Sequence, residues 1–206
     1  CHQMPMIPLS RAHRPLTDTH AEWREWKQRT GRQETCTDCH MPSVQRPIAN
    51  GGPVRVSKKH TFPGGWSDEL VASGVTVSGI RWTEDGIELS VTNESGHRFP
   101  TGEPGRALII SAVFLDDAGL ETGRQEIRIE RRVVLPVGRE LGDTTLLPGE
   151  TRIVSLQTPS TAHVGTRRAR VMAVFDRLAN LPVAHLTDGR NREFKLVDEE
   201  LDWPDP

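Results

Sequence analysis

The feature that most constrains this chain is the run Cys36-Thr37-Asp38-Cys39-His40, a C-x-x-C-H motif. Two thiols three residues apart lie on nearly the same side of one helical turn, where both can reach the two vinyl groups of a single porphyrin. His40 then reaches the iron from one face as the proximal ligand. The motif therefore predicts a c-type haem held by Cys36, Cys39 and His40.

A C-x-x-C pair has other uses, and each expects a different setting. A thioredoxin-type redox pair would lie in a βαβ pattern, which does not surround this motif. Half of a zinc site would need a second pair of cysteines, which the chain lacks. A plain disulfide gives no reason for the histidine that directly follows Cys39. The continuation His40-Met41-Pro42 therefore favours haem attachment.

The first residues of the chain repeat part of the motif. Cys1-His2-Gln3-Met4-Pro5 echoes Cys39-His40-Met41-Pro42. We interpret Cys1-His2 as the second half of another C-x-x-C-H motif, whose first cysteine lies upstream and whose proximal ligand is His2. Two alternatives remain open, since Cys1 could instead be the lipidated first residue of a lipoprotein or a free thiol.

A six-coordinate haem iron needs a second axial ligand on its opposite face. His60 lies in the loop His60-Thr61-Phe62-Pro63-Gly64-Gly65, where Pro and Gly allow close backbone approach. His97 lies in a similar loop, Gly96-His97-Arg98-Phe99-Pro100-Thr101-Gly102. His20 and His13 are the candidates for the iron of the N-terminal motif. Each could also be an ordinary exposed histidine, and the residues do not fix which histidine serves which iron.

The chain divides into two parts by composition. All three cysteines and five of the eight histidines precede residue 66. Apolar side chains are too sparse there to form a core, so haem would supply it. We therefore expect a c-type haem-binding segment over residues 1–66 and a β-sandwich domain over residues 67–206.

Three short helices are expected in and after the haem-binding segment. Thr19 and Glu22 match a capping box at the start of a helix that ends near Gly31. Thr35 and Asp38 match the same pattern at the start of the C-x-x-C-H turn. A further short helix or turn is expected over 67–73, after a Gly/Pro-rich stretch.

From Val75 onward the hydrophobic period changes to two, which is typical of strands. Asp85-Gly86 is a hairpin signal between the first two strands. Further strands are predicted at 107–115, 126–135, 151–157, 169–175 and 193–197. The pattern predicts a mainly β fold, with short helices followed by an immunoglobulin-like antiparallel β-sandwich. The final Asp/Glu/Pro run is expected to be a solvated tail.

Several function classes find no support in the sequence. The net charge of −2 gives no reason to expect a nucleic-acid or anionic-membrane surface. No run of 18 apolar residues is present, so no transmembrane segment is expected. Neither a phosphate-binding glycine loop nor a G-x-S-x-G nucleophile motif occurs.

By its motifs the chain resembles bacterial multihaem c-type cytochromes. The resemblance implies closely packed, mostly bis-histidine haems that pass electrons in series, with His40 and His2 as proximal ligands. It also implies His60 as a distal ligand, and His97 as a further candidate. Beyond residue 106 only the β pattern agrees with the sandwich domain that closes some of these proteins. The matching stretches are Glu25-Trp26, Thr35 to Pro42, His60 to Gly65, Gly96 to Gly102 and Leu147 to Thr151.

The expected function is electron transfer by covalently bound haem c, as the C-terminal portion of a multihaem cytochrome. Expected partners are other haem domains, redox partner proteins, or other subunits of a cytochrome complex or filament. The alternative is a multihaem oxidoreductase acting on a small nitrogen or sulfur species. No acid–base cluster surrounds the motifs, which favours a carrier over a catalyst. Because haem c is attached outside the cytoplasm, a periplasmic or extracellular location follows, with anchoring through a missing part or a lipid left open.

Overall fold

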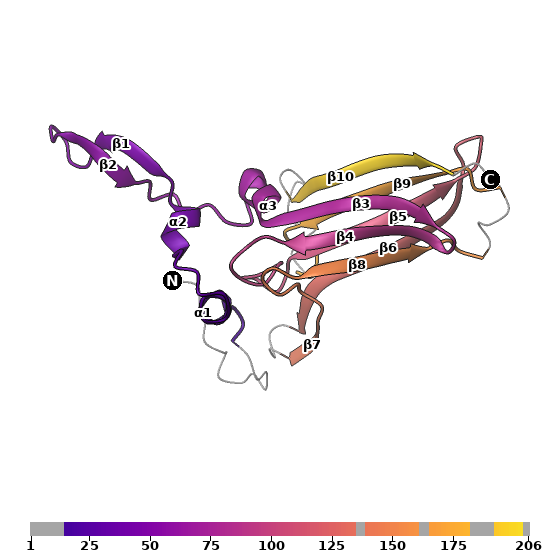
Figure 1. The fold of residues 1–206 in the computed structure, drawn as a ribbon, viewed down its shortest axis with the longest axis horizontal. Helices are drawn as coiled ribbons and strands as arrows, with labels where there is room; N and C mark the ends of the chain where they lie inside the picture. The colour runs from indigo at the N-terminus through magenta and orange to yellow at the C-terminus, as the bar shows by residue number, and fades with distance from the viewer. Residues whose placement is uncertain (1–14, 135–138, 161–164, 182–191, 204–206) are drawn as a thin grey trace.

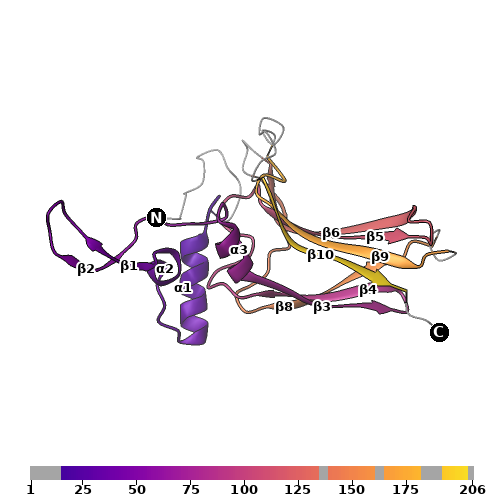
Figure 2. The ribbon, with the colours of Figure 1, turned by 90° about the horizontal axis from the view of Figure 1, so that it is seen from above.

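The computed structural model describes residues 15–134, 139–160, 165–181 and 192–203. Cys1, His2 and His13 lie outside these residues, so the expectations for the N-terminal motif stay predictions. Figure 1 shows a sandwich of two sheets, with a helical segment at one end and a thin two-stranded arm beyond it. The turned view in Figure 2 separates the two sheets of the sandwich. Within the described part of the chain, no helix is long and apolar enough to cross a membrane.

The helices begin and end close to where the sequence predicts them. Helix α1 spans Thr19–Thr30 and is closed by Gly31, whose φ of 72° suits a residue without a side chain. Helix α2 spans Cys36–His40, and the predicted capping box between Thr35 and Asp38 is confirmed. Helix α3 spans Asp68–Gly74 and begins with the hydroxyl of Ser67 accepting from the backbone N–H of Leu70.

The capping box predicted at the start of α1 is wrong. Asp18 is the residue that precedes the helix, and no side chain caps it. The Thr19 hydroxyl contacts the Thr101 hydroxyl instead, at 3.0 Å. The Glu22 carboxylate also points away from its own helix, toward the loop that contains Thr101. Both side chains of the motif therefore hold the helix against the sandwich.

A two-stranded arm follows α2, where the sequence indicates only a Gly/Pro-rich stretch. Strands β1 (Ser43–Pro47) and β2 (Val54–Lys58) pair antiparallel and extend away from the rest of the molecule (Figure 1). Ile48, Val54 and Val56 are exposed on it. Residues 43–59 contain four cations, and residues 42–67 contain no carboxylate.

The sandwich contains a three-stranded sheet in the order β3-β4-β8 and a five-stranded sheet in the order β10-β9-β5-β6-β7. All pairings are antiparallel, which confirms the predicted mainly β, immunoglobulin-like fold class. The strands are β3 (Val75–Thr83), β4 (Gly86–Asn93), β5 (Ala107–Leu115), β6 (Glu121–Val134), β7 (Arg139–Asp143), β8 (Thr151–Gln157), β9 (Arg168–Asp176) and β10 (Glu193–Asp202).

The core lies between the two sheets and has no polar interruption at its centre. Alternate residues of β4 face inward as Ile87, Leu89 and Val91, and each is at most 1% exposed. Strand β5 is buried along most of its length because β6 and β9 flank it on both sides. Phe114 and Phe175 fill the space between the sheets.

The C-terminal acidic run is part of the sheet, so the expected solvated tail is wrong for its first half. Strand β10 continues to Asp202. Cross-strand pairs explain the extension, because Asp198 binds Arg170 at 2.7 Å and Glu200 binds Arg168 at 2.8 Å. Arg170 and Lys195 hold the pKa of the Asp198 carboxyl below its usual range, with the Arg170 hydrogen bond as the main cause.

Candidate functional site

The two cysteines of the C-x-x-C-H motif project from helix α2 without a disulfide between them. Cys36 is half-buried and Cys39 is exposed. The helix begins at Thr35, whose backbone N–H and hydroxyl both donate to the Asp38 carboxylate, at 2.9 and 2.7 Å. These two bonds, with a smaller contribution from Lys58, lower the pKa of Asp38 to about 2. The turn that presents both thiols is therefore fixed by its own first residue.

The electrostatic setting of Cys39 does not suit a redox-active thiol. Partial burial, helped by Asp38 and Glu34, raises the pKa of the Cys39 thiol. Cysteines that catalyse thiol–disulfide exchange have lowered pKa values and lie in electropositive surroundings. The Cys39 thiol therefore lacks the activation that thiol–disulfide exchange would need.

The His40 imidazole is held on one side by the loop that follows the arm. Its Nδ1 lies 2.6 Å from the carbonyl oxygen of Pro63. The Phe62 ring stacks on it, with centroids 4.8 Å apart and planes 7° from parallel. Because a carbonyl oxygen can only accept, Nδ1 must carry the proton, which places the lone pair of the neutral ring on Nε2.

The His97 ring lies opposite His40, in the loop between β4 and β5. The two ring centroids are 6.3 Å apart and the ring planes are 25° from parallel. His97 Nδ1 lies 2.9 Å from the carbonyl oxygen of Arg98 and 3.2 Å from the Ser95 hydroxyl. The backbone of this loop is fixed by Asn93, whose amide donates to the His97 carbonyl at 2.8 Å.

The separation of these two rings fits a metal ion between them. A ligating imidazole nitrogen lies about 2 Å from its metal, so two rings on opposite sides of one ion have centres roughly 6 Å apart. Metal-bound histidines usually donate their other N–H to a carbonyl or carboxylate. His40 and His97 both have such a carbonyl at Nδ1. The residues present therefore fit an iron with two histidine ligands, next to two thiols.

A buried arginine of the sandwich anchors the loop that holds His40. The Arg177 side chain is 1% exposed, and its Nε donates to the Gly65 carbonyl at 2.6 Å. Arg177 also binds Asp68 at the start of α3 and lies over the Trp66 ring at 5.5 Å. The loop is thereby joined to the body of the sandwich two residues after Pro63.

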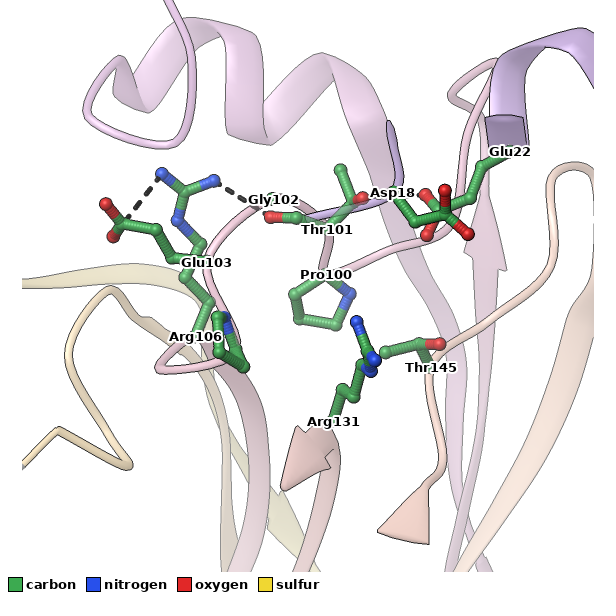
Figure 3. A pocket seen from close by; sticks show the side chains of 10 residues that line it. Asp18, Glu22, Pro100, Thr101, Gly102, Glu103, Arg106, Arg131 and Thr145 are labelled. Carbon is green, nitrogen blue, oxygen red and sulfur yellow. Dashed lines mark hydrogen bonds and ion pairs between the residues drawn. The ribbon is translucent and has the colours of Figure 1, made fainter. Parts of the chain in front are cut away.

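Helix α1 packs against the loop that contains His97. The Trp26 ring covers Gly96 so closely that a Cβ there would lie 3.1 Å from it. Arg29 donates to the Pro148 carbonyl at 2.7 Å. Figure 3 shows Glu22 and Asp18 of this segment beside Thr101, at the edge of a small hollow that Arg106 and Arg131 also line.

The other predicted site residues lie elsewhere. His60 is exposed at the turn after β2, and among the described residues no ring contact joins it to His40. His20 is half-buried in the first turn of α1, where its ring lies 5.7 Å from that of Trp23. The structure therefore brings His97, and not His60, to His40. Across the described ranges, no group of three or more His, Cys, Asp or Glu side chains could hold a metal ion by itself.

Three residues that shape the site were missed by the sequence interpretation. The sequence assigns Glu22 to a capping box and Pro63 only to the loop that would bring His60 close, and it gives Arg177 no role. Pro63 acts through its backbone carbonyl, which no side-chain pattern reveals. The one signal in the sequence for Arg177 is its place two residues after the apolar end of the predicted strand at 169–175.

Comparison with known proteins gives one structural likeness. No family model matches the chain, and no curated protein matches its sequence. A solved structure, the crystal structure of a penta-heme cytochrome c552 from Thermochromatium tepidum, is similar in fold with a TM-score of 0.73 and 19% sequence identity. The match covers 98% of this chain and 54% of that one, so the chain spans about half the length of its structural neighbour. At this identity the likeness shows the fold alone.

Proposed function

We propose that this chain binds one haem c through Cys36, Cys39 and His40 and transfers electrons as part of a multihaem cytochrome. The observation that supports this most strongly is the pairing of His40 with His97 across 6.3 Å, beside two free thiols on one helical turn. The haem iron would supply the chemistry, a reversible one-electron change between ferric and ferrous states. The fold shared with a penta-heme cytochrome agrees with this proposal.

In this proposal His97 would hold the haem iron together with His40. The carbonyls of Pro63 and Arg98 occupy Nδ1 of the two rings, so each ring would hold the iron through Nε2. Two protein ligands leave no coordination position for a substrate, which favours an electron carrier over an enzyme. The sandwich then has a direct role, because it supplies the loop that presents His97.

The proposal extends to location and partners. Thioether attachment of haem takes place outside the cytoplasm, so we propose a periplasmic or extracellular protein. Its electron donors and acceptors would be neighbouring haem domains or separate redox proteins. The exposed position of Cys39 on α2 would keep one edge of the porphyrin accessible to them.

The first test is to express the chain with a c-type haem maturation system and record its oxidised and reduced spectra. A low-spin haem whose α-band position indicates two thioethers, lost in a Cys36→Ser/Cys39→Ser double variant, is expected. Voltammetry should give a reversible one-electron wave. A five-coordinate, high-spin haem at this motif in the unaltered protein would contradict the electron-transfer proposal and favour the enzyme alternative.

The second test assigns the distal ligand. His97→Ala should convert the haem to a high-spin form that binds carbon monoxide when reduced. His60→Ala serves as the matched control, because His60 also lies in a loop two residues before a Phe-Pro pair but is exposed. The opposite result, with His60→Ala opening the iron and His97→Ala leaving it closed, would transfer the role to His60.

A further inference from the structure

Glu22 is a charged residue in a place that an apolar residue would normally fill. It is the one buried residue of α1 within the described chain, at 8% exposed. Its Oε2 accepts two hydrogen bonds from the sandwich, from the Arg98 backbone N–H at 3.2 Å and from the Thr101 hydroxyl at 2.6 Å. A buried carboxylate costs free energy unless such bonds are made, so its position is tightly defined by them.

Both donors belong to the loop that presents His97. The Arg98 N–H is part of the peptide that directly follows His97, and the Arg98 carbonyl holds His97 Nδ1 at 2.9 Å. Glu22 therefore hydrogen-bonds to the backbone between the His97 ring and the Arg98 carbonyl that orients this ring. The Thr101 bond fixes the other end of the same loop.

The surrounding contacts explain why the loop stays at one position along α1. Trp26, one turn after Glu22 on α1, lies against Gly96 on the other side of His97. Apolar packing by itself would allow the loop to slide along the helix, whereas a hydrogen bond to the Arg98 N–H fixes its register. Packing and hydrogen bonding together hold the loop from both sides of His97.

We propose that Glu22 is a positioning residue that keeps His97 on the haem iron. This inference rests on the proposed function, because it takes His97 as the distal ligand. Glu22 does not contact the iron in this proposal and acts through the Arg98 peptide and Thr101. Because Oε2 accepts both bonds, we take the acceptor atom, and not the charge, as the group that positions the loop.

The test measures how easily carbon monoxide displaces His97 from the reduced haem. Outer-shell partners of metal ligands typically change metal affinity by about 10–100-fold when removed. Glu22→Ala should therefore lower the carbon monoxide concentration for half-saturation by roughly ten-fold. Glu22→Gln, whose amide oxygen can accept both bonds, should stay near the unaltered protein. Glu25→Ala is the matched control, since Glu25 is exposed on the same helix.

A merely structural role gives a different pattern. In that case Glu22→Ala lowers the urea midpoint but leaves the carbon monoxide titration and the low-spin electron paramagnetic resonance signal unchanged, which overturns the proposal. A Glu22→Gln variant as reactive as Glu22→Ala would overturn the claim that the acceptor suffices. If the reduced haem of His97→Ala still does not bind carbon monoxide, then His97 is not the distal ligand, and the positioning role of Glu22 is also excluded. If His97→Ala opens the iron and Glu22→Ala does not, the positioning role alone fails.

Discussion

At the scale of single residues, the site is organised by groups that orient rings and thiols. Backbone carbonyls of Pro63 and Arg98 set the proton on Nδ1 of the two histidines. A side-chain carboxylate, Asp38, fixes the turn that presents the cysteines. None of these three groups is a proposed haem ligand, yet each decides where a proposed ligand lies.

Asp38 leads to a prediction about acid stability. Its pKa in the folded chain is about 2, against an ordinary value of 3.8, so folding favours the ionised form. Its contribution to stability should be complete above about pH 4 and be lost as the pH falls toward 2. Carboxyl NMR titration of the reduced protein should show the low pKa directly.

Two variants apportion the causes of the Asp38 shift. Thr35→Ala removes the hydroxyl donor and should raise the pKa of Asp38 more than Lys58→Gln does, because the Thr35 hydrogen bond is the larger cause. Titration of Asp38 near 3.8 in the unaltered protein would contradict the capping arrangement of α2.

At the scale of elements, the contact of α1 with the loop between β4 and β5 joins the helical N-terminal segment to the sandwich. The contact depends on the absence of a side chain at Gly96, where a Cβ would lie 3.1–3.3 Å from carbons of the Trp26 ring. Such crowding in a packed contact forces a backbone or rotamer shift.

We therefore expect Gly96→Ala to lower the free energy of unfolding by about 1–2 kcal/mol. Removing the ring should remove the crowding, so Gly96→Ala should cost less in a Trp26→Ala background. Gly74→Ala is a suitable control, because its Cβ would lie 3.7 Å or more from its neighbours. Urea unfolding of the four variants and the unaltered protein measures these differences, and an equal cost in both backgrounds would exclude the ring as its cause.

Elements with strong local signals could be predicted from the sequence. Strands β5 and β8 have the predicted bounds, because every residue of β5 except Ser111 is apolar and the Pro148-Gly149 turn marks the start of β8. The arm was missed since Pro47 and the Gly51-Gly52-Pro53 turn dominate its composition. Strand β7 was missed because it is short and polar and pairs along one edge only. Within the candidate site, the sequence identifies the C-x-x-C-H motif, whose residues are neighbours in the chain. The pairing of His40 with His97 depends on how loops far apart in the sequence meet in the fold.

At the scale of the whole molecule, the sandwich and the arm differ in how extensively they are packed and hydrogen-bonded. The sandwich has a continuous core, with β5 hydrogen-bonded on both sides. The arm has two strands and exposed apolar side chains, and no third strand pairs with it in the part of the chain that the structure describes (Figure 1). A lone two-stranded hairpin is marginally stable in water.

Hydrogen exchange should report this difference. We expect the amides of β1 and β2 to exchange within seconds to minutes, since the arm can open without unfolding the sandwich. The amides of β5 should exchange only by global unfolding. Mass spectrometry of exchanged peptides separates the two, and arm amides as protected as those of β5 would mean that something covers the arm in solution.

The arm also separates charge along the long axis of the molecule. Arg46, Arg55, Lys58 and Lys59 stand in or next to the arm, while the β3–β4 and β5–β6 turns at the opposite end of the sandwich (Figure 1) contain carboxylates, of which Asp117 is paired with Arg167. The excess of cations over carboxylates gives the arm a local positive potential, which a negatively charged surface would attract before contact. Approaching a negative surface at low ionic strength, the molecule would turn arm first, with α2 and its cysteines close behind.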